Sequence, residues 1–447
     1  MSKPQAFPSQ SHTARHATRR DFLKASAVGA GAAAMGTLSL GRMVHAAGNQ
    51  TFKVGLIGCG GRGSGAAVNA MNAGKDVKLV AMADVFEERL TGALKRLKKE
   101  KPDQVDVSPD RCFVGFDAYK KLLACGIDVA VIAAASHFHP MFLKAAVDAG
   151  KHIFCEKPHG LDVPGLKLAM AAAEEAKRKG LSLVSGLCWR YDPGVRETMK
   201  RVRDGAIGEI MAIQETYITS PYGLRERKPG WTEMEYQLQN WYHFNWLSGD
   251  QTGQQLIHSI DKSSWALGDK PPLKAWGTGG RQVCTEPKYG DQFDHHAVVF
   301  EYADGVKVFG FCRDQVGCYN ETSDIIFGTK GRAILPVRCR IEGPNPWRYE
   351  AAKTVKMSMT DIEHQELFDS IRRGKPLNNA DYMFTSTMLG ILAQMVCYTG
   401  QEITWQQAMN SKKMLAPARY AWDADPPVLP DRNGQYPCAM PGITKFE

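Results

Sequence analysis

The chain has 447 residues, of which 44% are hydrophobic, and a formal net charge of +9. Six Lys or Arg and one acidic residue lie in the first 47 positions, so the rest of the chain carries 50 basic and 46 acidic residues. Its net charge of about +4 is too small to indicate a nucleic-acid or membrane-surface partner, and its length of some 400 residues predicts two domains.

Residues 1–47 have the organisation of a targeting signal. Thr18-Arg19-Arg20-Asp21-Phe22-Leu23-Lys24 is a twin-arginine motif, Ala25–Leu40 is a run rich in Ala and Gly, and Val44-His45-Ala46 is a small-x-small cleavage site. A disordered basic arm or a membrane helix is the alternative, but the apolar run is short for a membrane span and diluted by glycine. The sequence therefore predicts a twin-arginine signal peptide, the export machinery as a partner, a periplasmic or otherwise exported location, and no stable membrane anchoring.

A glycine-rich turn connects a predicted strand, 52–57, to a predicted helix, 66–73. A dinucleotide fold needs glycine where the chain turns sharply, where the backbone approaches the pyrophosphate, and where the helix packs on the strand. The alternative is an ordinary glycine-rich turn, which the flanking strand and helix make less favourable. The predicted cofactor-binding residues of the turn are Gly58, Gly60, Gly61, Arg62 and Gly63.

Asp84 indicates which dinucleotide binds. It follows the apolar run 77–83 and lies 21 residues after Gly63, close to the spacing at which a carboxylate meets the adenosine ribose hydroxyls. This position favours NAD over NADP. Arg62 leaves NADP possible, because a guanidinium beside the loop could pair with a 2′-phosphate, although it could also be a solvated loop residue.

From Phe52 to about Asp192, short apolar segments alternate with helical segments. This pattern predicts an α/β fold, a Rossmann domain over residues 48–192 whose parallel sheet is covered on both faces. Gly74, Gly150 and Gly180 stand just past three of the helices, as C-terminal caps do. The predicted strands are 52–57, 77–83, 111–114, 128–134, 152–155 and 182–187, and the predicted helices are 66–73, 87–101, 141–149 and 163–179.

The pattern changes in residues 193–423, where strands and turns dominate after one helix, 193–204. Asp304-Gly305 predicts a hairpin, and Gly328-Thr329-Lys330-Gly331 predicts a second tight turn after 325–327. These elements predict an α+β domain with an open, largely antiparallel sheet and helices on one side. Its uncovered face favours a homo-oligomer, either a dimer or a tetramer. The predicted strands of this part are 210–219, 295–302 and 306–312.

Two stretches predict no regular element. Ser220–Asn245 is rich in Trp, Tyr, Arg and Gly, and is interpreted either as a sugar-stacking loop or as a long surface loop with its own small core. The tail, 424–447, is rich in proline.

Glu156-Lys157-Pro158 follows the predicted strand 152–155. Because the carboxyl ends of strands in a doubly wound sheet face the ligand crevice, Lys157 is expected to point at the nicotinamide. An oxidised nicotinamide ring is positively charged, so it lowers the pKa of the lysine and suits it to bind a substrate hydroxyl and share its proton. The alternative is a surface lysine that caps the strand.

Ala133–Pro158 resembles the Gfo/Idh/MocA family of sugar and polyol oxidoreductases, whose signature is a strand that ends in Glu-Lys-Pro. The resemblance covers essentially the whole mature chain, from the Gly58 loop to Tyr398-Thr399-Gly400. For Arg190 and Tyr191, which follow the last predicted strand of the Rossmann domain, packing at the domain boundary is the alternative to a role in the substrate pocket. The resemblance implies a catalytic Lys157, cofactor-binding roles for Glu156, Lys157 and His139, and a substrate pocket bordered by Arg190 and Tyr191.

A second group of candidate catalytic residues lies in Gly253–Asp261. On a regular helix Gln254 and Asp261 would share one face with His258. Many family members have an aspartate four residues before this histidine, and a neutral amide there cannot stabilise an imidazolium by charge. His258 is therefore predicted as the catalytic general base with weakened support, and Gln254 and Asp261 as substrate-binding residues. A satisfied core histidine and a structural or ion-paired Asp261 are the alternatives.

No metal site is predicted, because the sequence has no HExxH motif and no paired-cysteine motif. His137-x-His139 and His295-His296 are the nearest candidates. The eleven cysteines are an odd number without a CxxC pair, and twin-arginine export carries a protein folded in a reducing compartment, so buried thiols are expected.

These inferences predict an exported NAD(P)-dependent oxidoreductase that transfers a hydride between a carbinol of a sugar, glycoside or polyol and a tightly held cofactor. Outside the cytoplasm no free nicotinamide pool exists, so the cofactor is expected to stay bound and be recycled. One alternative is an NAD-dependent glycoside hydrolase that oxidises its substrate transiently, eliminates the leaving group, adds water and re-reduces the product. A second is a non-catalytic, nucleotide-retaining sugar-binding protein.

Overall fold

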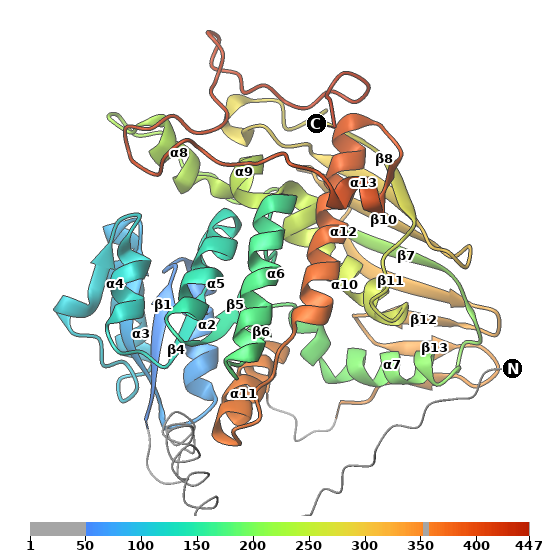
Figure 1. Cartoon of the computed structure of the whole chain (residues 1–447). Coiled ribbons are helices and arrows are strands. Elements are labelled where there is room, and N and C mark those ends of the chain that lie inside the picture. The colour runs from blue at the N-terminus through green and yellow to red at the C-terminus, as the bar shows by residue number, and fades with distance from the viewer. Residues whose placement is uncertain (1–50, 352–356, 447) are drawn as a thin grey trace, which may run out of the picture. The chain divides into compact units, whose positions relative to one another are not determined.

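The computed structural model describes residues 51–351 and 357–446 (Figure 1). The predicted signal peptide, 1–47, lies outside the described residues. A six-stranded, all-parallel sheet has the order β3-β2-β1-β4-β5-β6, which is the order of a Rossmann fold, as predicted. Its strands are β1 (Phe52–Ile57), β2 (Val77–Asp84), β3 (Cys112–Val114), β4 (Val129–Ile132), β5 (His152–Cys155) and β6 (Leu183–Ser185).

Helices cover both faces of this sheet. The apolar sides of α4 (Ala118–Ala124), α5 (His139–Asp148) and α6 (Val163–Arg178) share one buried cluster, and those of α2 (Gly61–Asn72) and α3 (Glu87–Glu100) share another. Four of these helices were predicted. The seven-residue α4 was missed, because so short an element carries little periodicity.

The predicted helix caps are confirmed in part. Gly150 and Gly180 adopt left-handed φ angles of 68° and 66° just past α5 and α6. The prediction for Gly74 is wrong, because Gly74 does not adopt a left-handed conformation. Glycine fits there for another reason: a Cβ would collide with the side chains of Asp76 and Arg372.

The second sheet has nine strands in the order β14-β13-β12-β11-β7-β10-β9-β8-β15. Strands β10 and β7 are parallel and every other neighbouring pair is antiparallel, so the predicted open, largely antiparallel sheet is confirmed. Both predicted hairpins are present. The strands are β7 (Ile210–Thr219), β8 (Lys274–Gly280), β9 (His295–Glu301), β10 (Lys307–Asp314), β11 (Glu321–Gly328), β12 (Arg332–Leu335), β13 (Arg340–Glu342), β14 (Trp347–Arg348) and β15 (Ile403–Thr404).

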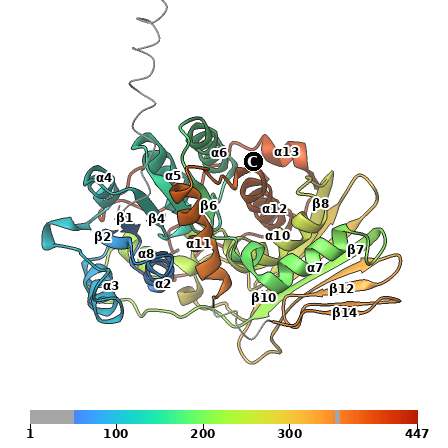
Figure 2. The same cartoon turned by 90° about the horizontal axis from the view of Figure 1, so that it is seen from below.

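Helices cover one face of the second sheet, where α7 (Pro193–Arg203), α10 (Ile257–Ala266) and α12 (Ala380–Thr399) lie (Figures 1 and 2). The other face carries an apolar row across neighbouring strands. Trp276 of β8 pairs with Val299 of β9, which pairs with Phe309 of β10, and Ile325 of β11 pairs with Ile334 of β12. Gln214 of β7 lies between Phe309 and Ile325 and interrupts the row. On the same face Phe311 is 40% exposed and Trp276 41%.

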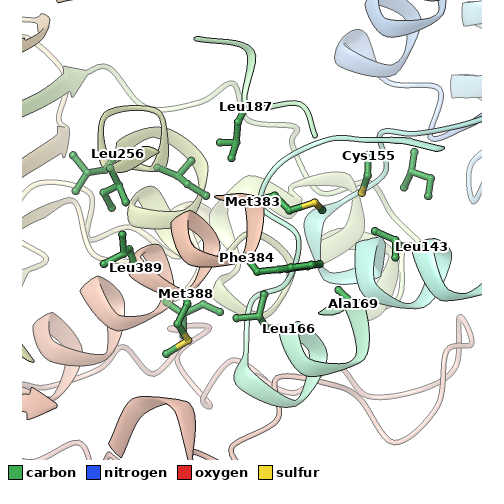
Figure 3. Close-up of a cluster of buried hydrophobic side chains, with 14 of the residues drawn as sticks. Leu143, Cys155, Leu166, Ala169, Leu187, Leu256, Met383, Phe384, Met388 and Leu389 are labelled. Carbon is green, nitrogen blue, oxygen red and sulfur yellow. The ribbon is translucent and has the colours of Figure 1, made fainter. Parts of the chain in front are cut away.

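Helix α12 makes the core continuous between the two sheets. It packs against α6 of the first half and against α10 and β8 of the second. Figure 3 shows side chains of α12 between those of α6 and the segment that precedes α10. The contributing residues labelled there include Met383, Phe384, Met388, Leu389, Leu166, Ala169 and Leu256.

The chain crosses between the two halves more than once. After the second sheet it returns as α11 (Met359–Arg372), which packs on α2 of the first half (Figure 2). Phe368 of α11 lies edge-on to Phe52 at 5.7 Å, and Arg372 pairs with Asp76 at 2.8 Å. The predicted division at residue 192 stays a prediction, since it does not account for this return.

The last regular element, α13 (Trp405–Met409), is followed by an irregular segment over residues 410–446. It begins before the tail predicted from residue 424. No helix in the described ranges is long and apolar enough to cross a membrane. All eleven cysteines are free thiols, and most of them are buried.

Candidate active site and cofactor cavity

A cavity of about 740 Å³ opens at the carboxyl ends of β1, β2 and β4. The predicted glycine loop forms its floor. Gly58 has a φ of 95°, and a Cβ there would lie 2.5 Å from the Ala134 nitrogen. A Cβ on Gly63 would lie 3.0 Å from the Gly58 carbonyl carbon and closer still to its oxygen. Both glycines are therefore needed for the fold of the loop itself.

Gly60 and Gly61 differ from those two glycines. A Cβ at either position would meet no atom within 4 Å, and the φ of −69° at Gly60 is open to any residue. Neither packing nor backbone conformation therefore requires glycine here. Glycine is required here if a ligand approaches the backbone at the start of α2. A pyrophosphate bound at a helix N-terminus needs this close approach. The loop fits a dinucleotide.

Asp84 ends β2 and lines the same cavity. Its Oδ2 accepts a hydrogen bond from the Cys59 nitrogen at 2.6 Å, and its Oδ1 accepts one from the Phe86 nitrogen at 2.9 Å. Burial raises the pKa of Asp84, which these backbone donors partly oppose. A carboxylate has about four acceptor positions, so Asp84 keeps capacity for ribose hydroxyls.

Arg62 does not extend toward Asp84. Its Nε pairs with Glu156 Oε1 at 2.8 Å, and its Nη2 donates to Asn69 at 3.0 Å. The guanidinium therefore connects the glycine loop to the end of β5. In this arrangement it is paired with Glu156 and is not directed toward the position of an NADP 2′-phosphate. Glu156 is 7% exposed and lies behind Arg62, which lines the cavity.

Lys157 stands at the crevice end of β5, as predicted, and its peptide bond to Pro158 is cis. Its ammonium donates to the backbone carbonyl of Gln254 at 2.5 Å. Burial lowers the pKa of Lys157, while the neighbouring Glu156 carboxylate opposes that shift. A half-buried ammonium with few anionic partners is suited to bind a substrate oxygen.

The expected helix face through Gln254, His258 and Asp261 is interrupted. Thr252–Leu256 form a π-helical turn before α10 begins at Ile257, so the four-residue spacing from Gln254 to His258 is not that of a regular helix, whereas His258 and Asp261 both lie in α10. The Gln254 side chain instead donates to Ser136 at 3.0 Å and to the Ser248 carbonyl. Gln254 contributes to the site through its carbonyl, which accepts from Lys157.

His258 lies in the first turn of α10, four residues after Gln254. Among the described residues its Nδ1 has no hydrogen-bond partner, and its ring lies 6.3 Å from that of Tyr217. Burial, and then the ammonium groups of Lys157 and Lys262, lower its pKa well below the usual value. His258 is therefore neutral near pH 7 and able to accept a proton.

Asp261 and Arg190 form an interior ion pair rather than a substrate contact. Arg190 Nη2 lies 2.9 Å from Asp261 and 2.5 Å from Asp269, and its guanidinium lies over the Tyr382 ring at 3.9 Å. Tyr191 is buried and donates to Asn379 at 2.9 Å. These contacts correspond to the structural alternatives. The predicted catalytic and substrate-binding residues all lie outside the lining of the cavity: Lys157, His258, Gln254, Asp261, Arg190 and Tyr191.

His139 is a positioning residue in this geometry. Its ring nitrogens lie 2.7 Å from the Pro158 carbonyl and 3.0 Å from the Ala134 carbonyl. It thus connects the turns that follow β4 and β5, and burial lowers its pKa to about 4. Its predicted cofactor contact stays a prediction.

The cavity has a second wall that the motifs did not indicate. We define the opposite wall as Gly223, Arg225 and Leu238–Tyr242, all of which line the cavity. They belong to the aromatic stretch 220–245. The prediction that this stretch forms no regular element is wrong, because α8 (Glu233–Gln239) lies within it. The richness of that stretch in Trp, Tyr and Arg was the one sequence signal. The stretch lines the cavity, and its two interpretations stay predictions.

Comparison with known proteins agrees with this geometry. Residues 52–184 match the GFO_IDH_MocA family, described as an oxidoreductase family with an NAD-binding Rossmann fold. Residues 52–184 therefore belong to the Gfo/Idh/MocA family. Residues 16–36 match the signal sequence of the twin-arginine translocation pathway. This family member is thus an NAD-dependent oxidoreductase acting on CH–OH groups, and it carries a twin-arginine signal.

Relatives of this family member include the inositol 2-dehydrogenase of Salmonella typhimurium strain LT2, 24% identical over 335 residues, which are 73% of this chain and 88% of the relative. The inositol 2-dehydrogenase of Rhizobium meliloti strain 1021 is 27% identical over 260 residues, which are 57% of this chain and 66% of the relative.

Solved structures share the fold. The aldose-aldose oxidoreductase of Caulobacter crescentus, complexed with glycerol, has a TM-score of 0.64 and 17% identity, and the match covers 79% of this chain and 100% of that one. A levoglucosan dehydrogenase complexed with NADH and levoglucosan also has a TM-score of 0.64, with 18% identity and coverage of 80% and 100%.

Proposed function

We propose that this enzyme oxidises a secondary alcohol of a sugar or polyol to a ketone and keeps its NAD bound between turnovers. The observation that carries the proposal is that Lys157, at the crevice end of β5, donates to the carbonyl of Gln254, four residues before His258, next to a loop that fits a dinucleotide. The relatives named as inositol dehydrogenases, and the levoglucosan dehydrogenase structure, support this substrate class.

The residues divide the work on the hydroxyl. Bound at the crevice, NAD supplies the acceptor for the hydride that leaves the carbinol carbon. Lys157 exchanges its bond to the Gln254 carbonyl for one to the substrate oxygen, and so fixes the hydroxyl and polarises it. His258, neutral at pH 7, takes the hydroxyl proton as the C–H bond breaks. A ketone and an imidazolium result.

The test is a panel of sugars, polyols and glycosides offered to the purified mature protein with its retained nucleotide, followed by reduced-nicotinamide fluorescence. Lasting reduction with a ketosugar in solution establishes the dehydrogenase. Substitution Lys157→Ala should abolish the signal while nucleotide content stays the same. If that variant turns over like the parent, Lys157 is not catalytic.

A redox-neutral reaction is the second candidate. One relative is the 2,7-anhydro-N-acetylneuraminate hydratase of Escherichia coli strain K12, 25% identical over 205 residues, 46% of this chain and 50% of the relative. The same Lys157 and His258 would serve transient oxidation, elimination and re-reduction of a glycoside. Release of an aglycone without lasting reduction would assign this reaction. If the parent shows no turnover and Lys157→Ala binds sugar as tightly as the parent, the protein is a binding protein.

Location and assembly complete the proposal. The twin-arginine signal supports export, and we propose the periplasm or the cell exterior as the working compartment. We also propose that a second copy of this chain covers the open face of the second sheet, where the row from Trp276 to Ile334 is uncovered in one chain.

A further inference from the structure

The opposite wall of the cavity is attached to the nucleotide half by direct hydrogen bonds. Arg89 of α3 donates to the Gln239 carbonyl at 3.2 Å and to its side-chain oxygen at 2.8 Å. The Gln239 amide donates in turn to Glu88 at 2.8 Å. Helix α8 is therefore connected to α3 across the cavity, although the two are about 150 residues apart in the chain.

Two arginines line the cavity, Arg89 of α3 and Arg225 of the opposite wall. Burial lowers the pKa of Arg89, the Asp84 carboxylate opposes that shift, and the like charge of Arg225 adds to it. The Arg89 Nε is buried and has no hydrogen-bond partner. An anionic group of the dinucleotide beside these arginines would supply an acceptor for the Arg89 Nε.

The irregular segment 410–446 packs on the cavity from outside. Trp422 lies 5.4 Å from the Phe86 ring and 4.8 Å from the Phe116 ring. Tyr420 lies 5.4 Å from the Phe138 ring, and its hydroxyl bonds His137 Nε2 at 2.7 Å. Phe86, Phe116 and Phe138 all line the cavity. We call these three residues the rim of the cavity, and the segment packs against them from outside.

The same segment continues to α8. Its Val428 carbonyl accepts from Gln237 at 2.7 Å, and the Tyr436 hydroxyl bonds Glu233. Figure 1 shows it as the dark red trace that runs from α13 along the upper edge of the molecule to α8. It therefore joins the rim near β2 and β3 to the helix of the opposite wall.

Both ends of the segment are fastened to the body of the protein. Near its start the Leu415 nitrogen donates to Asp162 at 2.8 Å. Near its end the Gly442 nitrogen donates to the Thr399 carbonyl at 2.8 Å. Because both ends of the segment are held, displacing the opposite wall requires breaking contacts along the whole length of the segment.

We propose that the segment 410–446 is a strap that closes the opposite wall over bound NAD and makes the nucleotide a non-exchanging group. The dinucleotide lies between the glycine loop and the opposite wall, with Arg89 and Arg225 on its outer side. The dinucleotide dissociates only when Trp422 and Tyr420 lose their contacts with Phe86, Phe116 and Phe138. A protein that works away from the cytoplasmic nucleotide pool needs this retention.

The test measures exchange of radiolabelled NAD from the full-length mature protein into an excess of unlabelled NAD. Trp422→Ala should release the label at least about tenfold faster than the parent, the equivalent of 1.4 kcal/mol of lost closure. Arg419→Ala is the matched control, because Arg419 pairs with Asp423 in the same segment and both side chains are exposed. It should exchange like the parent.

Equal exchange by the parent and Trp422→Ala would overturn the proposal. If thermal melting shows that Trp422→Ala is unfolded, Tyr420→Phe decides, because it removes only the hydroxyl that bonds His137. It should exchange several-fold faster, about the worth of one hydrogen bond, and parent-like exchange would overturn the strap. The proposal rests on NAD binding alone, so failure of every sugar in the panel would refute the proposed reaction without affecting this result.

Discussion

The glycine loop gives the sharpest prediction, because its glycines are required for different reasons. At Gly60 the φ of −69° and the open space around a new Cβ leave the unliganded fold unaffected by Gly60→Ala. Removing backbone freedom from the unfolded chain at a compatible position stabilises a protein by about 0.4–1 kcal/mol. The free energy of unfolding should therefore stay equal or rise slightly.

The same methyl group would stand where the pyrophosphate approaches the backbone. Loss of one charge-assisted hydrogen bond to phosphate costs about 1.5–3 kcal/mol, which weakens NAD binding by about ten- to 150-fold. Gly63→Ala is the matched variant. Its Cβ would press on the Gly58 carbonyl, so it should lose about 3 kcal/mol or more of folding stability, at the upper end of overpacking costs.

The assay combines urea denaturation of the nucleotide-free variants with titration calorimetry of NAD. The expected pattern is an intact fold with lost NAD affinity for Gly60→Ala, and a damaged fold for Gly63→Ala. Parent-like NAD affinity in Gly60→Ala would refute the assignment of this loop as the phosphate cradle. A large stability loss in that variant would refute the reasoning about its open surroundings.

Three further predictions concern catalysis, acid stability and the interior ion pair. Lys157→Ala should lower kcat by about 10²–10⁴-fold with unchanged NAD content, measured by steady-state kinetics. Burial lowers the pKa of His137, His139 and His243 to about 4, below their unfolded value of about 6.5. At these three sites the folded state then binds fewer protons, so their contribution to the free energy of unfolding is complete above pH 6.5 and is lost from pH 6.5 to 4 in urea titrations. It is opposite in sign to the contribution of Glu215, Asp291 and Asp314, whose pKa values burial raises to about 8, 7 and 9. Arg190→Met leaves Asp261 buried without its cation and should cost about 3–5 kcal/mol of stability.

Each of these has a contradicting outcome. A Lys157→Ala variant that loses NAD along with activity would point to cofactor binding rather than chemistry. If replacing His137, His139 and His243 leaves the pH dependence of stability between pH 6.5 and 4 unchanged, these histidines do not lower the acid stability. If Arg190→Met instead raises KM at parent stability, Arg190 contacts substrate after all. The exposed pair Lys144 and Asp148 supplies a control for the ion-pair measurement, with an expected loss below about 1 kcal/mol on removing Lys144.

The sequence determined the features that depend on local chemistry. Strand and helix periods predicted all six strands of the first sheet to within two residues, and turn residues such as Asp304-Gly305 predicted the hairpins of the second. The glycine loop, Asp84 and Lys157 were identified because each occupies a fixed position relative to a strand end. Such positions are set by a few neighbouring residues, so they can be read along the chain.

The tertiary structure decided which side chains meet. The π-helical turn at Thr252–Leu256 separated Gln254 from His258, a change of one hydrogen-bond register that apolar periodicity does not reveal. Arg190 found its partners 71 and 79 residues away, and so became structural.

The enclosure of the cavity depends on still longer separations. Tyr420 meets His137 across 283 residues, and Gln239 meets Arg89 across 150. Pairings of this kind are selected by the packing of whole elements against one another, which compensates the entropy of closing such long loops. The residues alone identified a nucleotide-binding oxidoreductase, and only the packed chain showed what surrounds its nucleotide.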